Sequence, residues 1–553
     1  MFHLQEADVQ PGWYDLEADL VVVGFGAAGA AAAIEAASAG ADVVVLDRFC
    51  GGGASKASGG VVYAGGGTAI QRQAGVSDSP EDMYRYLSME VGDAVSAATL
   101  RRFCAESAGM IEWLAAQGVP FEASLCPDKT SYPSNRHYLY YSGSERCGPF
   151  AEAATPAPRG HRARGKGTSG AVLYDALARS ARRSGVRVHP QTSAGSLILD
   201  EDGRVTGVEC TTMAAAPHWA RLAHRLLSRY ATKPGLYVPA LGRALHRRAA
   251  RLEQRHGRPL RVAARAGVLL AAGGFVANRE MMRSHAPGYR GGLPLGTAGD
   301  DGSGIRLGVR AGGSTAKMDR VSAWRFVTPP SALIEGLLVD RHGRRVCDES
   351  RYGAAIGEAM ITRHDGRAWL LIDSRILAAA RRQLRGPALW FQRMQGWYLL
   401  STARVTAHSL DELAARAGID ANGLRATVRE YHDALAAGEP DPVGKSVARR
   451  IDRPPYSLID CSIRPNLGYP CPMLTLGGLV VDEDTGAVLR DDGGHVPGLY
   501  AAGRSAVGVC SNSYVSGLSL ADCVFSGRRA GAHAITDLNI EGSESHAHRV
   551  RSR

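Results

Sequence analysis

Residues 18–29 read ADLVVVGFGAAG, and this stretch decides the fold of the chain. Its first half is a continuous apolar run, which is typical of a parallel strand buried on both faces. Its second half spaces Gly24, Gly26 and Gly29 as GxGxxG and opens an alanine-rich helix. A second apolar run, ADVVVLD, ends on Asp47. Together they predict a Rossmann-type strand–helix–strand unit with an acid at its end.

In that context the glycine pattern predicts a dinucleotide site. The first glycine permits a tight turn, the second lets a pyrophosphate approach the backbone, and the third lets helix and strand pack closely. The acid at the end of the second strand would accept hydrogen bonds from ribose hydroxyls.

Two further stretches favour FAD over NAD. Residues 51–60, GGGASKASGG, form a second loop suited to wrapping the pyrophosphate. Residues 498–504, GLYAAGR, read as a buried strand and glycine turn that would close the other side of the cofactor. The residues expected at the cofactor are Gly24, Gly26, Ala27, Ala28, Gly29, Asp47, Arg48, Ala54, Ser55, Ser58, Gly59, Gly60, Ala272, Gly273, Gly503, Arg504, Leu518 and Ser519.

The length of 553 residues allows two or three domains with a large core. Hydrophobic content of 45% with 67 glycines suggests a loop-rich α/β protein. From about residue 317 to 453 the sequence becomes more polar and less glycine-rich. We therefore predict an FAD-binding domain made of residues 1–316 and 454–540, an inserted catalytic domain at 317–453, and a disordered tail at 541–553.

The compartment is predicted from the N-terminus and the cysteines. The first residues are acidic and polar, with no cationic stretch leading into an apolar run, so no secretory signal is expected. The longest uncharged run, residues 20–34, is too short and glycine-rich to span a bilayer. Ten cysteines show no CxxC pair and no metal-ligand spacing. These features predict a cytoplasmic protein without a metal site.

A basic segment, residues 214–265, carries 12 Lys and Arg residues and one acidic residue, Glu253. The charge of this segment therefore equals the net charge of the whole chain, +11. Apolar residues recur in it at helical spacing, and Pro234-Gly235 is expected to divide it into two helices. It is interpreted as a helical appendage with solvated arginines, as a peripheral contact with an anionic membrane, or as a protein contact. Nucleic-acid binding is not expected, because no matching motif accompanies the charge.

Five segments match one family in order: VVVGFGAAG, GGGASKASGG, VLLAAGGFVANREMM, TLGGLVVD and GLYAAGRSAVG. From about residue 18 to 535 the chain resembles the flavoproteins that include fumarate reductase and the 3-ketosteroid dehydrogenases. This resemblance implies an α/β, Rossmann-type (GR2-like) FAD-binding domain interrupted by a smaller α+β catalytic domain, with the active site at their interface. The motif Tyr514-x-Ser516-Gly517 looks most like the 3-keto-5α-steroid Δ4-dehydrogenases of steroid metabolism and degradation. The helical insertion looks like a feature of the same subgroup.

Departures from other branches of the family refine the expectation. Fumarate reductases usually carry a histidine just before the Thr-x-Gly-Gly turn, and here Thr475 follows Cys-Pro-Met-Leu instead. The loop at residues 51–60 lacks the histidine that attaches FAD covalently in some relatives. We therefore predict non-covalent FAD and an apolar, uncharged substrate.

A saturated ketone loses a β-hydride to flavin N5 only once its α-proton is leaving. Tyr514 is predicted to donate to the ketone oxygen, with a second donor among the backbone N–H groups near Gly517 or Leu518. Ser516 is predicted to take the α-proton and to relay it to a tyrosine of the inserted domain. The resemblance implies that tyrosine, and we assign it to Tyr352.

Other readings of these residues stay open. Tyr514 would otherwise only pack against the flavin, Ser516 only cap a helix, and Tyr352 only line a domain interface. Rival activities are Δ1-dehydrogenation of the same steroids and reduction of an unsaturated acid. The electron acceptor is not specified by the sequence. The loop at residues 131–143 holds Tyr132, Tyr138, Tyr140 and Tyr141, which either line an apolar cavity or pack at the surface.

Overall fold

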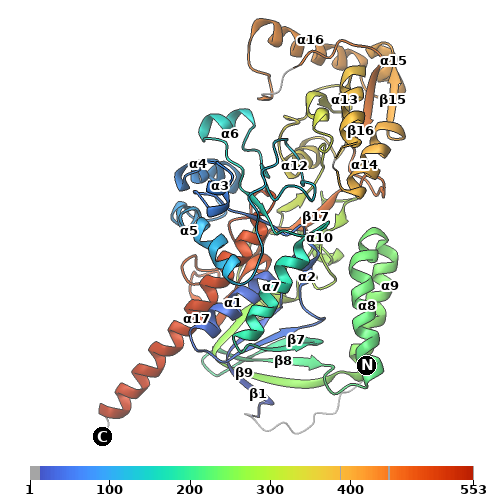
Figure 1. Cartoon of the computed structure of the whole chain (residues 1–553). Coiled ribbons are helices and arrows are strands. Elements are labelled where there is room, and N and C mark those ends of the chain that lie inside the picture. Colours follow the sequence, from blue (N-terminus) through green and yellow to red (C-terminus); the bar gives the residue numbers. More distant parts are fainter. Residues whose placement is uncertain (1–12, 387, 446–448, 552–553) are drawn as a thin grey trace.

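Figure 1 shows a computed structural model of the chain, which describes residues 13–386, 388–445 and 449–551. An eight-stranded sheet forms its centre, in the order β19-β20-β9-β1-β2-β6, with the β7–β8 hairpin continuing from β9. The strands of this sheet are β1 (Leu16–Val23), β2 (Val43–Asp47), β6 (Arg187–Pro190), β7 (Thr192–Leu199), β8 (Val205–Thr212), β9 (Arg258–Leu270), β19 (Ala487–Leu489) and β20 (His495–Ala501).

The central strands are buried on both faces, because their apolar runs alternate between two cores. Leu20 and Val22 of β1 belong to a core shared with α1 (Ala27–Ser38) and α17 (Leu518–Arg551). Val21 and Val23 belong to a second core on the other face, shared with β8 and β20. Strands β1, β2, β9 and β20 run parallel, which confirms the predicted Rossmann-type sheet.

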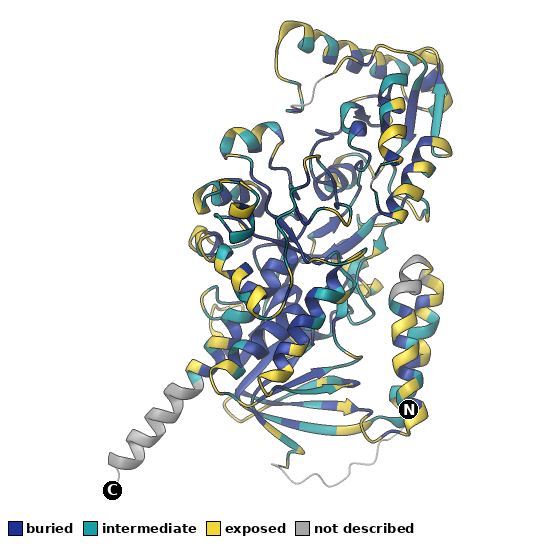
Figure 2. Ribbon diagram, in the orientation of Figure 1, coloured by how far each residue is buried: buried dark blue, intermediate teal, exposed yellow. Residues whose placement is uncertain are grey.

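Helices α1 and α17 pack closely through small residues. A Cβ atom added at Gly531 would lie 2.3 Å from the carbonyl oxygen of Ala32, and one at Gly527 would lie 2.4 Å from that of Ala28. The last helix of the chain therefore lies directly on the first, and Figure 2 shows the facing parts of both as buried.

A second sheet belongs to the inserted part of the chain. Its four strands are antiparallel in the order β13 (Leu337–Val339), β14 (Trp369–Ile372), β16 (Tyr456–Asp460) and β15 (Arg404–Ala407), with a separate core. Its helices are α12 (Gly353–Arg363), α13 (Ser374–Leu384), α14 (Trp390–Ser401), α15 (Leu410–Ala417) and α16 (Ala421–Ala437). The boundary predicted at Arg453 falls too early, because β16 pairs between β14 and β15.

Three small sheets accompany these two sheets in the described part of the chain. The strands are β10 (Leu293–Pro294), β12 (Val321–Ala323) and β17 (Pro472–Thr475) in one, β11 (Thr315–Ala316) and β18 (Gly478–Leu479) in another, and β3 (Val61–Tyr63), β4 (Leu139–Tyr140) and β5 (Gly160–Arg162) in a third. The remaining α-helices are α2 (Gly53–Ala57), α3 (Ala69–Gln73), α4 (Pro80–Val91), α5 (Ala97–Ala116), α6 (Gly148–Ala153), α7 (Gly170–Arg183), α10 (Arg279–His285) and α11 (Ser303–Arg310).

The basic segment forms a helical hairpin, α8 (His218–Tyr237) and α9 (Pro239–His256), at one side of the molecule (Figure 1). Two details differ from the prediction. The helices are separated at Val238 instead of at Pro234-Gly235, because Pro239 occupies the first turn of α9, where its missing N–H costs nothing. Residues 258–265 are strand β9 and not helix.

The C-terminal tail also differs from the prediction. Residues 541–551, expected to be disordered, continue α17 as helix, while 552–553 lie outside the described residues. Once the packed first half of a helix is formed, adding further residues costs little, because propagation is far easier than nucleation.

Candidate active site

The turn after β1 has the geometry of a dinucleotide cradle. Gly24 has φ +105°, and a Cβ atom there would lie 2.5 Å from the carbonyl oxygen of Ala271. At Gly29 a Cβ atom would lie 2.0 Å from the carbonyl oxygen of Gly24. A Cβ atom added at Gly26 would have more space, because the nearest atom, Ser55 Oγ, would lie 3.5 Å away. The turn therefore excludes side chains where the backbone is close and leaves space where a phosphate would approach.

Asp47 organises the loop at the end of β2. Its carboxylate accepts hydrogen bonds from the backbone N–H groups of Phe25 (3.0 Å), Phe49 (2.9 Å) and Gly51 (2.9 Å). Ser55 Oγ in the neighbouring loop accepts a hydrogen bond from Ala27 N–H at 3.0 Å. The predicted acid, the glycine turn and the loop at residues 51–60 therefore lie together.

The glycine turn after β20 brings in a buried arginine. Arg504 Nη2 lies 2.5 Å from Asp300 Oδ1, whereas Arg504 Nη1 is buried and has no hydrogen-bond partner among the described residues. A Cβ atom added at Gly274 would lie 3.3 Å from that Nη1, so the guanidinium lies against the backbone after Gly273. Burial alone lowers the pKa of Arg504, but the Asp300 carboxylate raises it above its ordinary value. An unpartnered charged donor at this place fits a cofactor with phosphates and carbonyl oxygens.

Several of the residues predicted to bind the cofactor lie in this cradle and at the start of α17. Ser58 Oγ donates to the carbonyl oxygen of Ser55 at 2.7 Å, and Gly59 accepts from the Tyr132 hydroxyl at 2.7 Å. Leu518 and Ser519 open α17 and are buried. These features fit an FAD bound along the edge formed by β1, β2, β9 and β20.

The predicted catalytic residues lie in one cluster. The Tyr352 and Tyr514 rings are 6.2 Å apart between centroids, and Trp324 stacks on Tyr514 at 5.1 Å and 25°. Ser516 Oγ lies 3.0 Å from the Tyr140 hydroxyl. Three segments far apart in sequence therefore deliver hydroxyl groups to the start of α17.

The phenols of this cluster are neutral at ordinary pH. Burial raises the pKa of Tyr514, and a hydrogen bond from the backbone of Gly517 only partly offsets it. Burial also raises the pKa of Tyr352 well above its ordinary value, assisted by Tyr514, while the Ser516 hydroxyl lowers it. Neutral phenols are hydrogen-bond donors, which suits polarisation of a ketone oxygen.

Sequence reasoning missed two members of the site. Tyr140 was grouped with the phenols of one loop, but in the structure it alone of the four bonds Ser516, whereas Tyr138 and Tyr132 donate to backbone carbonyls. Asp300 was missed although it lies in the acidic loop Gly299–Gly302. The available signal was an Asp-Asp-Gly sequence directly before α11.

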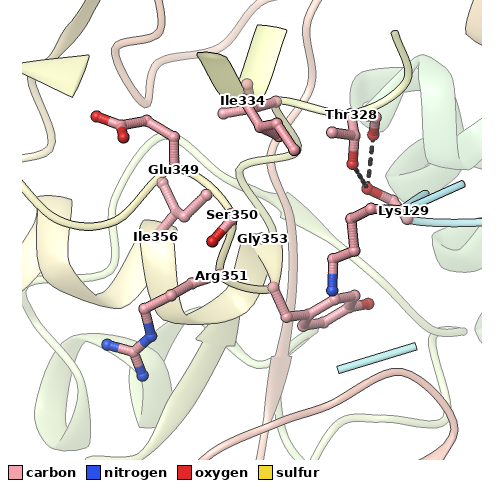
Figure 3. Close-up of a pocket in the computed structure, with 11 residues that line it drawn as sticks. Lys129, Thr328, Ile334, Glu349, Ser350, Arg351, Gly353 and Ile356 are labelled. Carbon is pink, nitrogen blue, oxygen red and sulfur yellow. Dashed lines mark hydrogen bonds between the residues drawn. The ribbon is translucent and has the colours of Figure 1, made fainter. Parts of the chain in front are cut away.

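A small cavity lies beside Tyr352, and Figure 3 shows its charged walls. Lys129, Glu349 and Arg351 line it. Glu349 is paired with Arg345 at 3.0 Å and with Lys445 at 3.1 Å. Val327, Ile334 and Ile356 also line it, so the cavity has both charged and apolar walls.

The helical hairpin touches the cofactor loop. Glu253 of α9 accepts from Arg48 Nη2 at 2.9 Å and lies 2.8 Å from His224 Nε2 of α8. Arg48 also pairs with Asp301 at 3.3 Å, and the Phe49 ring stacks on His224. The residue directly after Asp47 is therefore held by the hairpin.

Comparison with known proteins settles the family. The model of a family described as FAD binding domain matches residues 19–520. The chain belongs to this FAD-binding family. Membership confirms the predicted cofactor and fold class. Attachment of FAD without a covalent bond stays a prediction.

Relatives of this flavoprotein include enzymes of both expected branches. It is 40% identical to the 3-oxo-5-alpha-steroid 4-dehydrogenase of Comamonas testosteroni, over 89% of its own length and 93% of the relative's. It is 24% identical to a fumarate reductase (cytochrome) of Shewanella frigidimarina, over 93% and 76% of the two chains. A solved 3-ketosteroid-delta4-(5alpha)-dehydrogenase from Rhodococcus jostii, in complex with 4-androstene-3,17-dione, shares 32% identity and a TM-score of 0.79, covering 95% and 98% of the chains.

Neither a membrane-spanning helix nor a metal-ligand cluster occurs in the described part of the chain. Within the described ranges, no helix combines the length and the hydropathy needed to cross a bilayer. The same residues contain no group of three or more His, Cys, Asp or Glu side chains placed to hold a metal ion.

Proposed function

We propose that this flavoprotein converts a 3-keto-5α-steroid into the corresponding 3-keto-4-ene steroid. The observation that carries the proposal is the cluster of Tyr514, Ser516 and Tyr352 at the start of α17. Support comes from the two relatives named for this activity, at 40% and 32% identity over most of the chain. An aromatic wall of Trp324 and Phe326 beside Tyr514 suits an apolar polycyclic ketone.

Each residue of the cluster has a separate role in the reaction. Tyr514 donates its phenol proton in a hydrogen bond to the ketone oxygen, and a backbone N–H at the start of α17 adds a second donor. Both donors favour the enolate that forms as the α-proton leaves. Ser516 takes that proton while it gives its own hydroxyl proton to the phenolate form of Tyr352, which becomes the neutral phenol. FAD, when bound, supplies the acceptor for the hydride that leaves the β-carbon.

Proton relay requires a hydroxyl that can give and receive in turn. Ser516 lies between Tyr140 and Tyr352, and neither phenol is solvent-exposed. A serine alone is a weak base, so the relay requires Tyr352 as phenolate, whose negative charge is lost as it accepts the proton. The steroid loses one proton and one hydride, and a carbon–carbon double bond is left.

The test is anaerobic mixing of the FAD-loaded protein with 5α-androstane-3,17-dione, while the visible absorption of oxidised flavin is followed. Loss of that absorption together with a 4-ene product supports the proposal. Product NMR distinguishes the 4-ene from the 1-ene, which has the same mass. An unreacted flavin with this steroid, or a 1-ene product, contradicts the proposed regiochemistry. Oxidation of the pre-reduced protein by fumarate would favour a reductase instead.

We also propose that the flavoprotein contacts a membrane surface through residues 214–265, because its proposed substrate dissolves in lipid and the hairpin exposes apolar side chains. Cell fractionation tests this contact. Deleting the hairpin is expected to move the protein out of the membrane fraction, and an unchanged distribution contradicts the proposed contact.

Turnover also requires a separate electron acceptor, which reoxidises the reduced flavin.

A further inference from the structure

The outward face of α8 carries a row of exposed apolar side chains. Trp219, Leu222, Leu226 and Tyr230 are 59%, 44%, 41% and 56% exposed. Their spacing of three and four residues places them on one side of the helix. A contiguous exposed row of large apolar side chains marks an interaction surface more often than a surface without a binding partner.

The outward face of α9 is cationic. Arg243, Arg247, Arg248, Arg251 and Arg255 are all exposed. Within the described part of the chain, none of the five has a carboxylate at ion-pair distance. By contrast, Arg261 and Arg265 of the adjoining strand β9 pair with Glu209 at 2.8 Å and Asp19 at 2.8 Å. Two arginines of the strand are thus neutralised, whereas the five arginines of the helix are available.

The orientation of the hairpin is fixed by its inward face. His224 of α8 and Ala249 of α9 are buried, and Glu253 binds both Arg48 and His224. The apolar row and the arginines lie on the opposite sides of their helices from these anchors. Figure 2 shows exposed residues along both helices. The two rows therefore point away from the buried contacts that hold the hairpin together and join it to Arg48.

We propose that this docking face, made of Trp219, Leu222, Leu226 and Tyr230 with the five arginines of α9, binds an anionic lipid bilayer. The proposal deepens the membrane contact proposed above and rests on it. Charge complementarity selects the partner, because exposed arginines and exposed apolar side chains match the phosphates and acyl chains of lipids. A second copy of the chain would bring two cationic faces together, and a nucleic acid would leave the apolar row without a partner.

Vesicle flotation of the FAD-loaded full-length protein tests the proposal. We expect binding to phosphatidylcholine vesicles that contain phosphatidylglycerol, and at least about tenfold weaker partition to pure phosphatidylcholine. Arg248→Gln/Arg251→Gln/Arg255→Gln should lower partition to the anionic vesicles about tenfold. Leu222→Ser/Leu226→Ser should lower it on both kinds of vesicle. Arg381→Gln/Arg382→Gln/Arg385→Gln, on exposed positions around α13, makes the same charge change and should have no effect.

The outcomes separate the proposals. Equal binding to neutral and anionic vesicles overturns the selectivity for anionic lipid but leaves the membrane contact standing. Binding to neither overturns both. Self-association seen by light scattering and removed by Leu222→Ser/Leu226→Ser makes a second copy the occupant and overturns the lipid proposal. Reduction of flavin by steroid is measured on every variant, so failure of the dehydrogenase proposal is detected independently.

Discussion

Tyr514 lies between Trp324 and Tyr352, and its surroundings determine what its phenol can do. Stacking on the indole fixes the plane of the ring, and burial keeps the phenol protonated. A fixed, neutral donor needs no reorganisation as charge develops on a ketone oxygen. The same environment would be unsuitable for a carboxylate-binding site, which needs cationic partners.

Replacing Tyr514 with Phe removes the hydroxyl and keeps the stacked ring. The rate of flavin reduction by steroid should fall about 10²–10³-fold, because one donor to the developing oxyanion is lost. Stopped-flow absorbance under anaerobic conditions measures the rate, and FAD fluorescence checks that the cofactor stays bound. A rate within twofold of the parent would exclude this phenol from the chemistry.

The proton acceptor predicts a pH dependence with a definite sign. The pKa of Tyr352 is raised well above the ordinary value of 10, and a base acts only when deprotonated. The reactive fraction should therefore grow about tenfold for each pH unit, with no plateau below pH 10. Single-turnover rates in a series of buffers test this, and Tyr352→Phe should lose the slope. A plateau near neutral pH in the parent would point to another base.

The site was predictable from sequence where its parts are adjacent. Tyr514 and Ser516 lie in one short motif, so the pattern itself located them. Tyr352 came from the family resemblance. The partner of Ser516, Tyr140, is separated from it by 376 positions, and Asp300 is separated from Arg504 by 204. Nothing local to either residue indicates such a pairing.

At the level of elements, the link between α9 and the loop after β2 is the least expected feature. Glu253 was recognised only as the single acid in a basic segment. In the structure it holds Arg48, whose side chain is one-third exposed, while its own is largely buried. The hairpin therefore supports the cofactor site as well as carrying the docking face.

Glu253→Ala should weaken FAD binding about tenfold, or about 1.4 kcal/mol, because Arg48 keeps only its longer pair with Asp301 and can turn toward Asp47. Fluorescence titration of the apoprotein with FAD measures the affinity. In an Arg48→Ala background the same substitution should have less than about a twofold effect. Glu209→Ala, which breaks a pair with Arg261, is the matched control. Equal losses in both backgrounds would show that Glu253 acts independently of Arg48.

Sequence periodicity located most elements but not all of their limits. The apolar runs gave β1 and β2, because buried parallel strands have no polar alternation to obscure them. The first half of β9 was mistaken for part of the helical insertion, since its arginines continue the charge of α9. Its register is set by β8, a partner that no local pattern reveals.

On the scale of the whole molecule, a buried histidine makes stability depend on pH. His161 is fully buried, bonds Thr68 at 2.8 Å, and has a pKa lowered to about 4 from 6.5, mainly by burial. The unfolded chain binds this proton below pH 6.5 and the folded chain does not. The free energy of unfolding should therefore fall by about 3 kcal/mol as pH drops from 6.5 to 4.

Chemical denaturation at several pH values measures this loss. His161→Gln should reduce the slope on the acid side, whereas His408→Gln, at an exposed position, should not. An unchanged slope in His161→Gln would assign the acid sensitivity to other groups.

The architecture as a whole was predictable because the family resemblance extends along nearly the entire chain. What remained uncertain was where one part ends and the other begins. The inserted sheet takes in β16, which follows a stretch that reads as a return to the first domain. Domain boundaries depend on which strands pair, and pairing is a property of the folded chain.

The contact between the first and last helices has a consequence for biosynthesis. Gly527 and Gly531 complete the packing of α1, yet they leave the ribosome only after more than five hundred earlier residues. Until then the nucleotide cradle of the nascent chain is incomplete on one side, and the alanine-rich face of α1 is exposed to chaperones. We therefore expect FAD to be captured only after synthesis of α17, and a prematurely terminated chain to contain the fingerprint motif but to bind the coenzyme poorly.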